Sequence, residues 1–159
     1  MIRKIAGNDF DFIFYLYMHP VTNPFLLYDV MDSESFRPIF NDLLEIGIIY
    51  VYSDDGNDIG MFKLVPQTYR CSHIVYLGGL AVHPSFAGRG YGYKMMQEII
   101  GFAKSEGFLR IELGVSLINE KAIHLYKKAG FEQEGVLKKY IYLKNENKFL
   151  DDMMMAYMV

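Results

Sequence analysis

The stretch from His83 to Met96 reads HPSFAGRGYGYKMM. It follows an apolar run, IVYLGGLAV at residues 74–82, and opens into a helical pattern. The apolar side chains of that pattern share one face: Met95, Met96, Ile99, Ile100 and Ala103. This order predicts a strand, a glycine-rich turn and a helix. Because glycines let a ligand approach the backbone and the first N–H groups of a helix are unpaired, the turn suits a phosphate or pyrophosphate.

The spacing of the glycines excludes two nucleotide-binding motifs. A Walker A loop ends in Gly-Lys-Ser/Thr, and the dinucleotide fingerprint is G-x-G-x-x-G. Here the glycines fall as G-x-G-x-G from Gly88 to Gly92. The turn therefore supports neither nucleotide-binding fold.

The sequence after this helix predicts a second strand and a second helix. Residues 110–115, RIELGV, read as a buried strand, and Asn119 is suited to cap the helix KAIHLYKKAG, which ends at Gly130. Tyr126 shares a face of that helix with apolar residues, so we expect it to point toward the sheet. The order of elements predicts a parallel βαβ unit with a helix appended.

Together, LAVHPSFAGRGYG at residues 80–92 and IELGVSLINEKAIHLYKKAGFEQEGVLKKY at residues 111–140 resemble the GNAT superfamily of acetyl-coenzyme A dependent N-acetyltransferases. The resemblance depends on the joint spacing of the glycine loop, Asn119 and the Tyr-x-x-x-Gly-Phe signature that starts at Tyr126. It is clear from Ile74 to the C-terminus. The C-terminal part, including Asp151 to Ala156, is similar to the branch that acetylates free amino acids and other small amines.

The resemblance implies a role for each matching position. Backbone groups of residues 80–82 would hold the pantetheine arm and polarise the thioester carbonyl, and the N–H groups of the glycine loop would cradle the pyrophosphate. Asn119 would contact acetyl-coenzyme A, and Tyr126 would protonate the departing thiolate. The cofactor-binding residues so implied are Leu80, Ala81, Val82, Ala87, Gly88, Arg89, Gly90, Tyr91, Gly92, Asn119 and Tyr126.

The chemistry explains why such groups are needed. An amine that attacks a thioester creates an oxyanion and expels a thiolate, so the site needs a donor at the carbonyl and an acid at the sulfur. Direct attack in a ternary complex needs no covalent enzyme intermediate, which fits a chain whose single cysteine, Cys71, lies in a predicted loop. Glu112 is a candidate base acting through water, although it can instead pair with Arg110. Tyr76 is a candidate for orienting the amine.

Two positions depart from the family pattern. The loop has Ala87 where the family usually has Arg or Gln, and the strand before it has Leu77 where an acidic residue is frequent. The general base is therefore not identified. These departures keep open a catalytically silent acyl-coenzyme A binding module.

The acceptor site of the family is covered by a helix, loop and helix that correspond to the N-terminal part of this chain. Its apolar residues suggest a free amino acid with an apolar side chain as the favoured acceptor: Phe25, Leu27, Tyr28 and Phe36. Acidic residues at 29, 32 and 34 leave a polyamine open. Acetylation of a protein N-terminus or lysine is a further alternative, and it would need an open groove.

Length and composition set the remaining expectations. The 159 residues and 18.4 kDa fit a single domain over residues 1–159, and 52% hydrophobic residues can form one core. A net charge of −3 with scattered basic residues argues against a nucleic-acid partner, and no apolar run has membrane-spanning length. Four histidines and one cysteine show no metal-ligand spacing. We expect a cytoplasmic enzyme, and the resemblance is compatible with a homodimer.

The pattern of elements predicts the fold class. A hairpin is expected around Asp54 to Asn57, and two long strands are expected after Phe131. The chain therefore predicts an α/β fold with a mixed sheet of six or seven strands and about four helices. The sheet should be antiparallel at its start and end and parallel in its middle.

Overall fold

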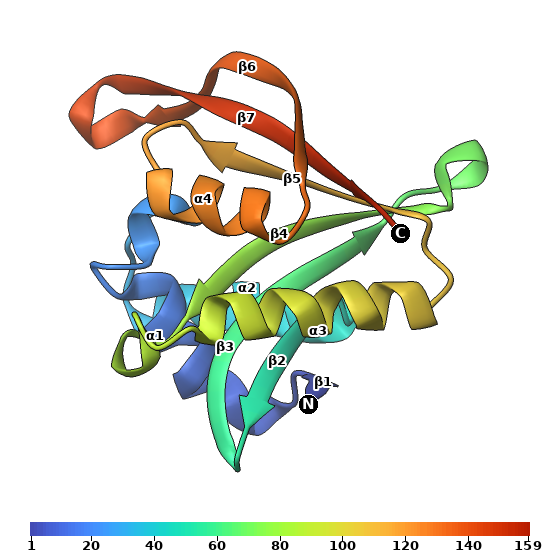
Figure 1. The fold of residues 1–159 in the computed structure, drawn as a ribbon. Helices are drawn as coiled ribbons and strands as arrows, with labels where there is room; N and C mark the ends of the chain where they lie inside the picture. The colour runs from blue at the N-terminus through green and yellow to red at the C-terminus, as the bar shows by residue number, and fades with distance from the viewer. The chain divides into compact units, whose positions relative to one another are not determined.

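The computed structural model describes residues 1–159 and contains one mixed sheet of seven strands together with four α-helices (Figure 1). In chain order the elements are β1 (Ile2–Lys4), α1 (Phe10–Met18), α2 (Ser33–Ile46), β2 (Ile49–Asp54), β3 (Asn57–Pro66), β4 (Ile74–Val82), α3 (Tyr91–Ser105), β5 (Arg110–Ser116), α4 (Glu120–Lys128), β6 (Glu132–Leu143) and β7 (Lys148–Met158). The strand order is β1-β2-β3-β4-β5-β7-β6. β4 and β5 pair in parallel, whereas β1 with β2, β2 with β3 and β7 with both its neighbours are antiparallel. The predicted fold class is confirmed.

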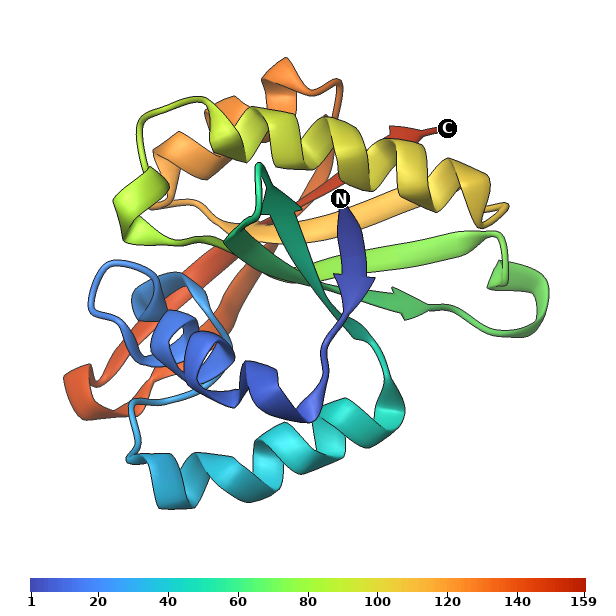
Figure 2. The ribbon, with the colours of Figure 1, turned by 90° about the horizontal axis from the view of Figure 1, so that it is seen from below.

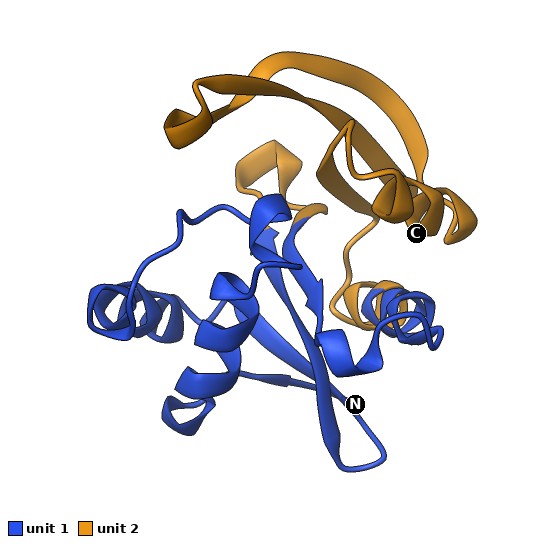
Figure 3. Cartoon of the chain, turned by 90° about the vertical axis from the view of Figure 1, so that its left-hand side faces the viewer, with its two compact units in different colours: residues 1–65, 77–99 blue, residues 66–76, 100–159 orange.

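The chain divides into two compact units, which Figure 3 shows in different colours. The first consists of Met1–Val65 and Leu77–Ile99, and the second of Pro66–Tyr76 and Ile100–Val159. β4 and α3 contribute residues to both units. Each unit is described by itself below.

In the first unit, α1 and α2 lie side by side and pack their apolar faces against β2 and β3 (Figure 2). Asp32 caps α2, because its Oδ1 accepts a hydrogen bond of 2.8 Å from the Ser35 N–H, and Gly47 ends the helix at φ 69°. Such caps depend on neighbouring residues, so the sequence predicts them. The core that results is mainly aromatic and aliphatic: Ile5, Phe10, Ile13, Leu16, Tyr17, Phe36, Phe40, Leu43, Ile49, Val51, Met61 and Ala81.

The β2–β3 hairpin turns at Asp55 and Gly56, which have φ values of 46° and 77°. Asp54 faces Asn57 across the turn. Two successive residues with positive φ are typical of the tight turn that matches strand twist. The hairpin prediction is confirmed.

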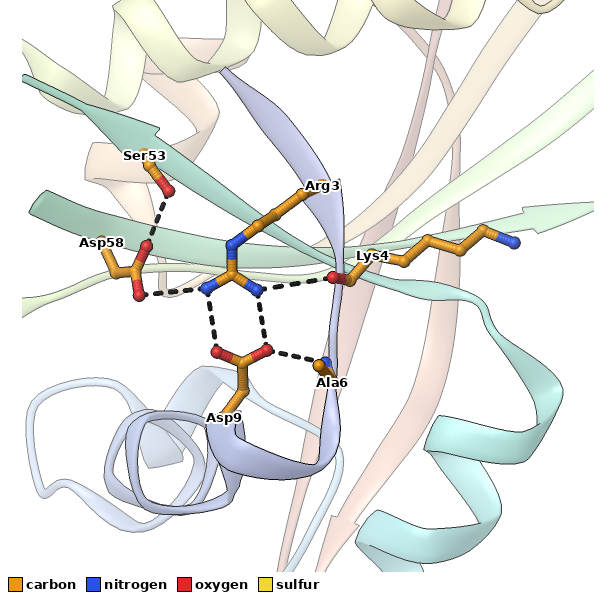
Figure 4. A network of polar contacts seen from close by, with 6 residues as sticks. All are labelled: Arg3, Lys4, Ala6, Asp9, Ser53 and Asp58. Carbon is orange, nitrogen blue, oxygen red and sulfur yellow. Dashed lines mark hydrogen bonds and ion pairs between the residues drawn. The ribbon is translucent and has the colours of Figure 1, made fainter. Parts of the chain in front are cut away.

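A charge network joins the hairpin to the N-terminal strand (Figure 4). The Arg3 guanidinium donates hydrogen bonds of 2.7 and 2.9 Å to the buried Asp9 carboxylate and one of 3.1 Å to Asp58. Asp9 also accepts from the Ala6 N–H at 2.7 Å, and Asp58 accepts from the Ser53 hydroxyl at 2.6 Å. Each of these charges therefore has at least one partner.

In the second unit, β5 pairs with β4 on one side and with β7 on the other. Ile111, Leu113 and Val115 form the buried face of β5. The opposite face is less deeply buried and carries the polar residues and a glycine: Arg110, Glu112, Gly114 and Ser116. Residues that face each other across a strand pair share a face, so this polar face continues onto Tyr76 of β4 and Asp152 of β7.

Candidate active site

The glycine turn of the first unit is an exposed loop that precedes α3. Gly88 and Gly90 adopt φ values of 74° and 81°, in the left-handed region that favours glycine. The N–H groups of Gly88, Arg89 and Gly90 have no hydrogen-bond partner in the structure. Ala87 is exposed, and its own N–H donates to the Pro84 carbonyl at 3.1 Å. Unpaired N–H groups in a turn of this kind fit the oxygen atoms of a phosphate or pyrophosphate.

Leu80, Ala81 and Val82 form the end of β4 that leads into this turn. A Cβ on Gly60 of β3 would overlap the Ala81 carbonyl oxygen, so the two backbones approach closely here. Gly79, just before this segment, has φ 56° and interrupts the regular strand geometry. Such an irregularity changes the direction of the backbone groups that follow it.

The four predicted acceptor residues differ in burial. Phe36 is fully buried in the core, and the Tyr28 ring lies against it at 6.1 Å between ring centroids. Tyr28 is half-buried, whereas Phe25 and Leu27 are 47% and 69% exposed. Of the four, Tyr28 is therefore the best placed to meet a small ligand, with Phe36 as its support.

A lysine lies beside this aromatic pair. Lys63 belongs to β3, its Nζ lies 5.7 Å from the centre of the Tyr28 ring, and no carboxylate lies within 4.0 Å of it. Burial lowers the pKa of Lys63 from its ordinary value. The Tyr17 hydroxyl is also near, since it and the Lys63 Cε lie 3.2 and 3.1 Å from the point where a Cβ on Gly79 would sit.

Tyr126 lies on α4 in the second unit and is 8% exposed. Its ring packs against the Phe131 ring, with 6.0 Å between the ring centroids. These two residues are the Tyr and the Phe of the Tyr-x-x-x-Gly-Phe signature. Burial, with a smaller effect from the nearby Tyr76, raises the pKa of the Tyr126 hydroxyl. The hydroxyl is therefore protonated at neutral pH. Asn119 caps the same helix, because its side-chain oxygen accepts a 3.3 Å hydrogen bond from the Ala122 N–H.

Tyr76 stands beside a buried carboxylate. The Tyr76 hydroxyl and Asp152 Oδ2 lie 3.3 and 3.0 Å from the point where a Cβ on Gly114 would sit, so both occupy the space that this glycine leaves. Asp152 is 7% exposed and has no ion-pair partner. Burial raises the pKa of Asp152, and burial is also the main cause that raises the pKa of Tyr76. The Ser116 hydroxyl, opposite Asp152 in the strand pair, is buried without a hydrogen-bond partner.

Glu112 has a different environment on the same face. Its Oε2 accepts hydrogen bonds of 3.2 and 3.1 Å from Arg110. Arg110 also donates to Glu134 at 2.8 Å and forms an ion pair with it. The two glutamates hold the pKa of the Arg110 guanidinium above its ordinary value, with the hydrogen bond to Glu134 as the largest cause. Glu112 thus belongs to a paired network.

The family comparison matches residues 11–131 of the chain to the acetyltransferase (GNAT) family. The chain belongs to the GNAT family. It is 38% identical over 106 residues to the L-amino acid N-acetyltransferase AaaT of Escherichia coli (strain K12), which covers 64% of this chain and 62% of that relative. It is 40% identical over 60 residues to an uncharacterized N-acetyltransferase of Methanocaldococcus jannaschii, which covers 38% of this chain and 26% of that relative. The matches thus span less than two thirds of either relative.

The fold of this GNAT chain is shared with solved structures. Spermidine N-acetyltransferase from Vibrio cholerae, solved with CoA and spermine, superposes with a TM-score of 0.85 at 19% identity over 99% of this chain and 94% of that one. No group of three or more His, Cys, Asp or Glu side chains is placed to hold a metal ion. None of the helices combines the length and apolar composition that a membrane span requires.

Two charged residues, one in each unit, were not among the residues predicted from the sequence. Lys63 is the only charged residue within the run GMFKLV. A single lysine in an apolar strand indicates a cation with apolar neighbours, and this signal could have identified Lys63. Asp152 is the second aspartate of an Asp-Asp pair before three methionines. Alternation along β7 buries Asp152 and leaves Asp151 partly exposed, which only the strand register decides.

Proposed function

We propose that this GNAT protein transfers the acetyl group of acetyl-coenzyme A to the primary amine of a small molecule, by direct attack in a ternary complex. The favoured acceptor is a free amino acid with an apolar side chain. The observation that carries the proposal is Tyr126, a buried hydroxyl that remains protonated at neutral pH and stands next to Tyr76. Family membership supplies the reaction class.

Tyr126 is proposed as the general acid. As the bond between carbonyl carbon and sulfur breaks, negative charge grows on the sulfur, and a positioned hydroxyl stabilises that charge and then transfers its proton. Asn119 holds the first turn of α4 in place and is proposed to contact the coenzyme. Solvent restores the proton on Tyr126 after release of the thiol.

The coenzyme is proposed to bind through its pyrophosphate at residues 87–92 and through its pantetheine arm at residues 80–82. Three unpaired N–H groups in the turn and its two left-handed glycines support the first assignment. The Ala87 side chain cannot bind an anion and its N–H already donates to Pro84, so the loop relies on the N–H groups of Gly88, Arg89 and Gly90 and on the Arg89 side chain. Acetyl-coenzyme A supplies the activated acyl group.

The proton that leaves the amine needs an acceptor, and we propose Asp152. Of the two carboxylates on this face of the sheet, Glu112 is held by Arg110, whereas Asp152 has no cation and a pKa raised by burial. A raised pKa brings a carboxylate closer to the range of an effective base. Tyr76, beside Asp152, is proposed to orient the amine. Glu112 remains the competing assignment.

The experiment that tests the function measures release of the coenzyme A thiol from acetyl-coenzyme A with a panel of acceptors. The panel contains apolar amino acids, spermidine, and a peptide with a free N-terminus and a lysine, and coenzyme binding is measured in parallel. Turnover with amino acids is expected. Turnover with spermidine or the peptide alone would reassign the acceptor, and tight coenzyme binding without any turnover would favour a binding module.

Tyr126→Phe adds a test of the mechanism. The variant retains the ring and its packing on Phe131, so coenzyme binding should be unchanged while kcat falls by about 100-fold. An unchanged kcat and pH profile would show that Tyr126 is not the acid.

A further inference from the structure

The first unit contains two hydrogen-bond donors without acceptors at one point of the sheet. The donors are the Lys63 ammonium, which has no carboxylate within ion-pair distance, and the Tyr17 hydroxyl, which is buried without a partner. Tyr17 is 0% exposed. Buried polar groups normally have partners, so the Tyr17 hydroxyl is an exception, whereas the ammonium of the partly buried Lys63 is open to a ligand.

Strand register places Lys63 on the face of the sheet that α1 and α2 cover. Lys63 faces Ile49 of β2, and Met61, two residues earlier, faces Val51. These three apolar residues belong to the same core cluster as Tyr17 and Phe36. Lys63 is only partly buried at the border of this cluster, so its charged end is not sealed inside the core.

Gly79 brings the two donors together. A Cβ at this position would lie 3.1 Å from the Lys63 Cε and 3.2 Å from the Tyr17 hydroxyl oxygen. The positive φ of Gly79 and the missing side chain therefore allow both groups to approach the strand that carries Leu80 to Val82.

Tyr28 supplies the wall of this site. Its ring stands at 67° to the Tyr17 ring with centroids 5.0 Å apart, and the Lys63 ammonium lies over it at 5.7 Å. Burial is the main cause that raises the pKa of the Tyr28 hydroxyl, and the charge of Asp42 adds to it. Asp42 forms no ion pair with Lys63. The site is therefore cationic and aromatic.

We propose that the partly exposed Lys63 ammonium, beside the Tyr28 ring, binds the carboxylate of the acceptor. A carboxylate accepts charge-assisted hydrogen bonds from an ammonium, so it supplies the partner that Lys63 lacks in the protein. The acceptor is then an α-amino acid that carries a free carboxylate. A polyamine is disfavoured, because its ammonium groups would be repelled by Lys63. This inference rests on the proposed function and narrows its substrate.

The test compares three acceptors that differ in one group: leucine, leucinamide and 3-methylbutylamine. The wild-type protein should prefer leucine. Lys63→Met, which retains most of the side-chain volume, should raise KM for leucine by about 10- to 100-fold, since that is the usual effect of a lost charged hydrogen bond. It should change kcat/KM for the other two acceptors less than about 3-fold.

The matched control is Lys4→Met, which removes an exposed lysine of the same unit and should alter none of these values. Tyr17→Phe should change KM for leucine less than about 3-fold, because the Tyr17 hydroxyl is fully buried and a ligand cannot reach it. Circular dichroism establishes that each variant is folded.

Two results would overturn the inference. One is an equal loss for leucine and the two uncharged analogues in Lys63→Met, which would show that Lys63 acts on the thioester or the fold. The other is a wild-type protein that acetylates the amide or the amine as well as leucine. If no acceptor is turned over, the proposed function fails, and binding of N-acetyl-leucine decides the inference by itself. Calorimetry must then show binding to the wild type and a 10-fold or greater loss in Lys63→Met.

Discussion

The charged residues near the two ends of β3 differ in whether they have an ion-pair partner. At one end Asp58 is satisfied by Arg3 and by the Ser53 hydroxyl, in a network that also holds the buried Asp9 (Figure 4). Near the other end Lys63 lies among apolar neighbours without a carboxylate. A paired charge recovers its lost hydration within the protein, whereas an unpaired, partly exposed one keeps its donors for water or a ligand. The first arrangement stabilises the unit, and the second is the one expected of a binding site.

The second unit repeats this contrast on a single face of the sheet. Glu112 is bound by Arg110, while Asp152 has only Tyr76 and a buried hydroxyl, that of Ser116, nearby. We therefore treat a charged residue without an ion-pair partner as a candidate functional group, and a paired one as structural. Variants that remove one charge at a time test this separation.

The largest effect is expected from Asp152→Asn. Loss of the proposed base should lower kcat by about 100-fold or more, whereas the matched variant Glu112→Gln should lower it less than about 10-fold. The Asn variant should also be more stable at neutral pH. Because burial raises the pKa of Asp152, this carboxylate costs stability in full above the folded pKa, and the cost reaches zero only below the unfolded pKa, about 3.9.

Steady-state kinetics and thermal unfolding at several pH values measure both effects. The gain in stability from Asp152→Asn should shrink as the pH falls through the folded pKa of Asp152 and vanish below the unfolded pKa. If Glu112→Gln is the more damaging variant, the assignment of the base is reversed.

Gly79→Ala should destabilise the protein by about 2–3 kcal/mol. About 1–2 kcal/mol comes from the left-handed backbone, and the rest from displacement of Lys63 and Tyr17. Gly56→Ala is the control, since Gly56 has φ 77° and nothing lies within 4 Å of an added Cβ. This variant should lose only the stability that the left-handed backbone costs. Denaturant unfolding measures the difference. Equal losses would mean that the two donors do not constrain Gly79.

Asp9→Asn should reduce stability by about 2 kcal/mol, because Arg3 loses its main charged hydrogen-bond partner. The hydrogen bond from Arg3 lowers the pKa of Asp9 below its ordinary value. The contribution of Asp9 is therefore complete above the unfolded pKa, about 3.9, and is lost as the pH falls through the folded pKa.

The comparison variant is Asp54→Asn, which breaks the pair between Asp54 and Lys94 and should cost less than about 1 kcal/mol. Urea unfolding between pH 3 and pH 7 distinguishes the two variants. A loss in Asp9→Asn that does not change with pH would contradict the role given to its charge.

The smallest effect is a gain in stability in Lys63→Met. Burial lowers the pKa of Lys63, so its charged form costs stability at neutral pH, and the cost shrinks above the folded pKa and is gone above the unfolded pKa, about 10.4. Removal of the charge should raise Tm by roughly 2 °C at pH 7, with a smaller gain at alkaline pH. Arg3→Met should instead lower Tm. A lower Tm in both variants would place Lys63 among the structural charges.

Much of the fold could be predicted from the sequence because its signals are local. The hairpin at Asp55 and Gly56, the cap at Asn119 and the βαβ order around the glycine turn each depend on residues close together in the chain. The same local signals carry the family resemblance that the comparison confirms. Tyr126 is predictable as a buried residue for this reason, since its helix has one apolar face.

The partners of the charged residues could not be predicted in this way. Arg3 meets Asp58 across 55 residues of sequence, and Asp152 meets Tyr76 only because β7 and β4 flank β5 in a given register. A shift of one residue along β7 would bury Asp151 in place of Asp152. By itself, the sequence determined the order of elements, the glycine turn and the family. Only the tertiary structure decided which charges are paired, because pairing depends on strand register and close packing between distant segments.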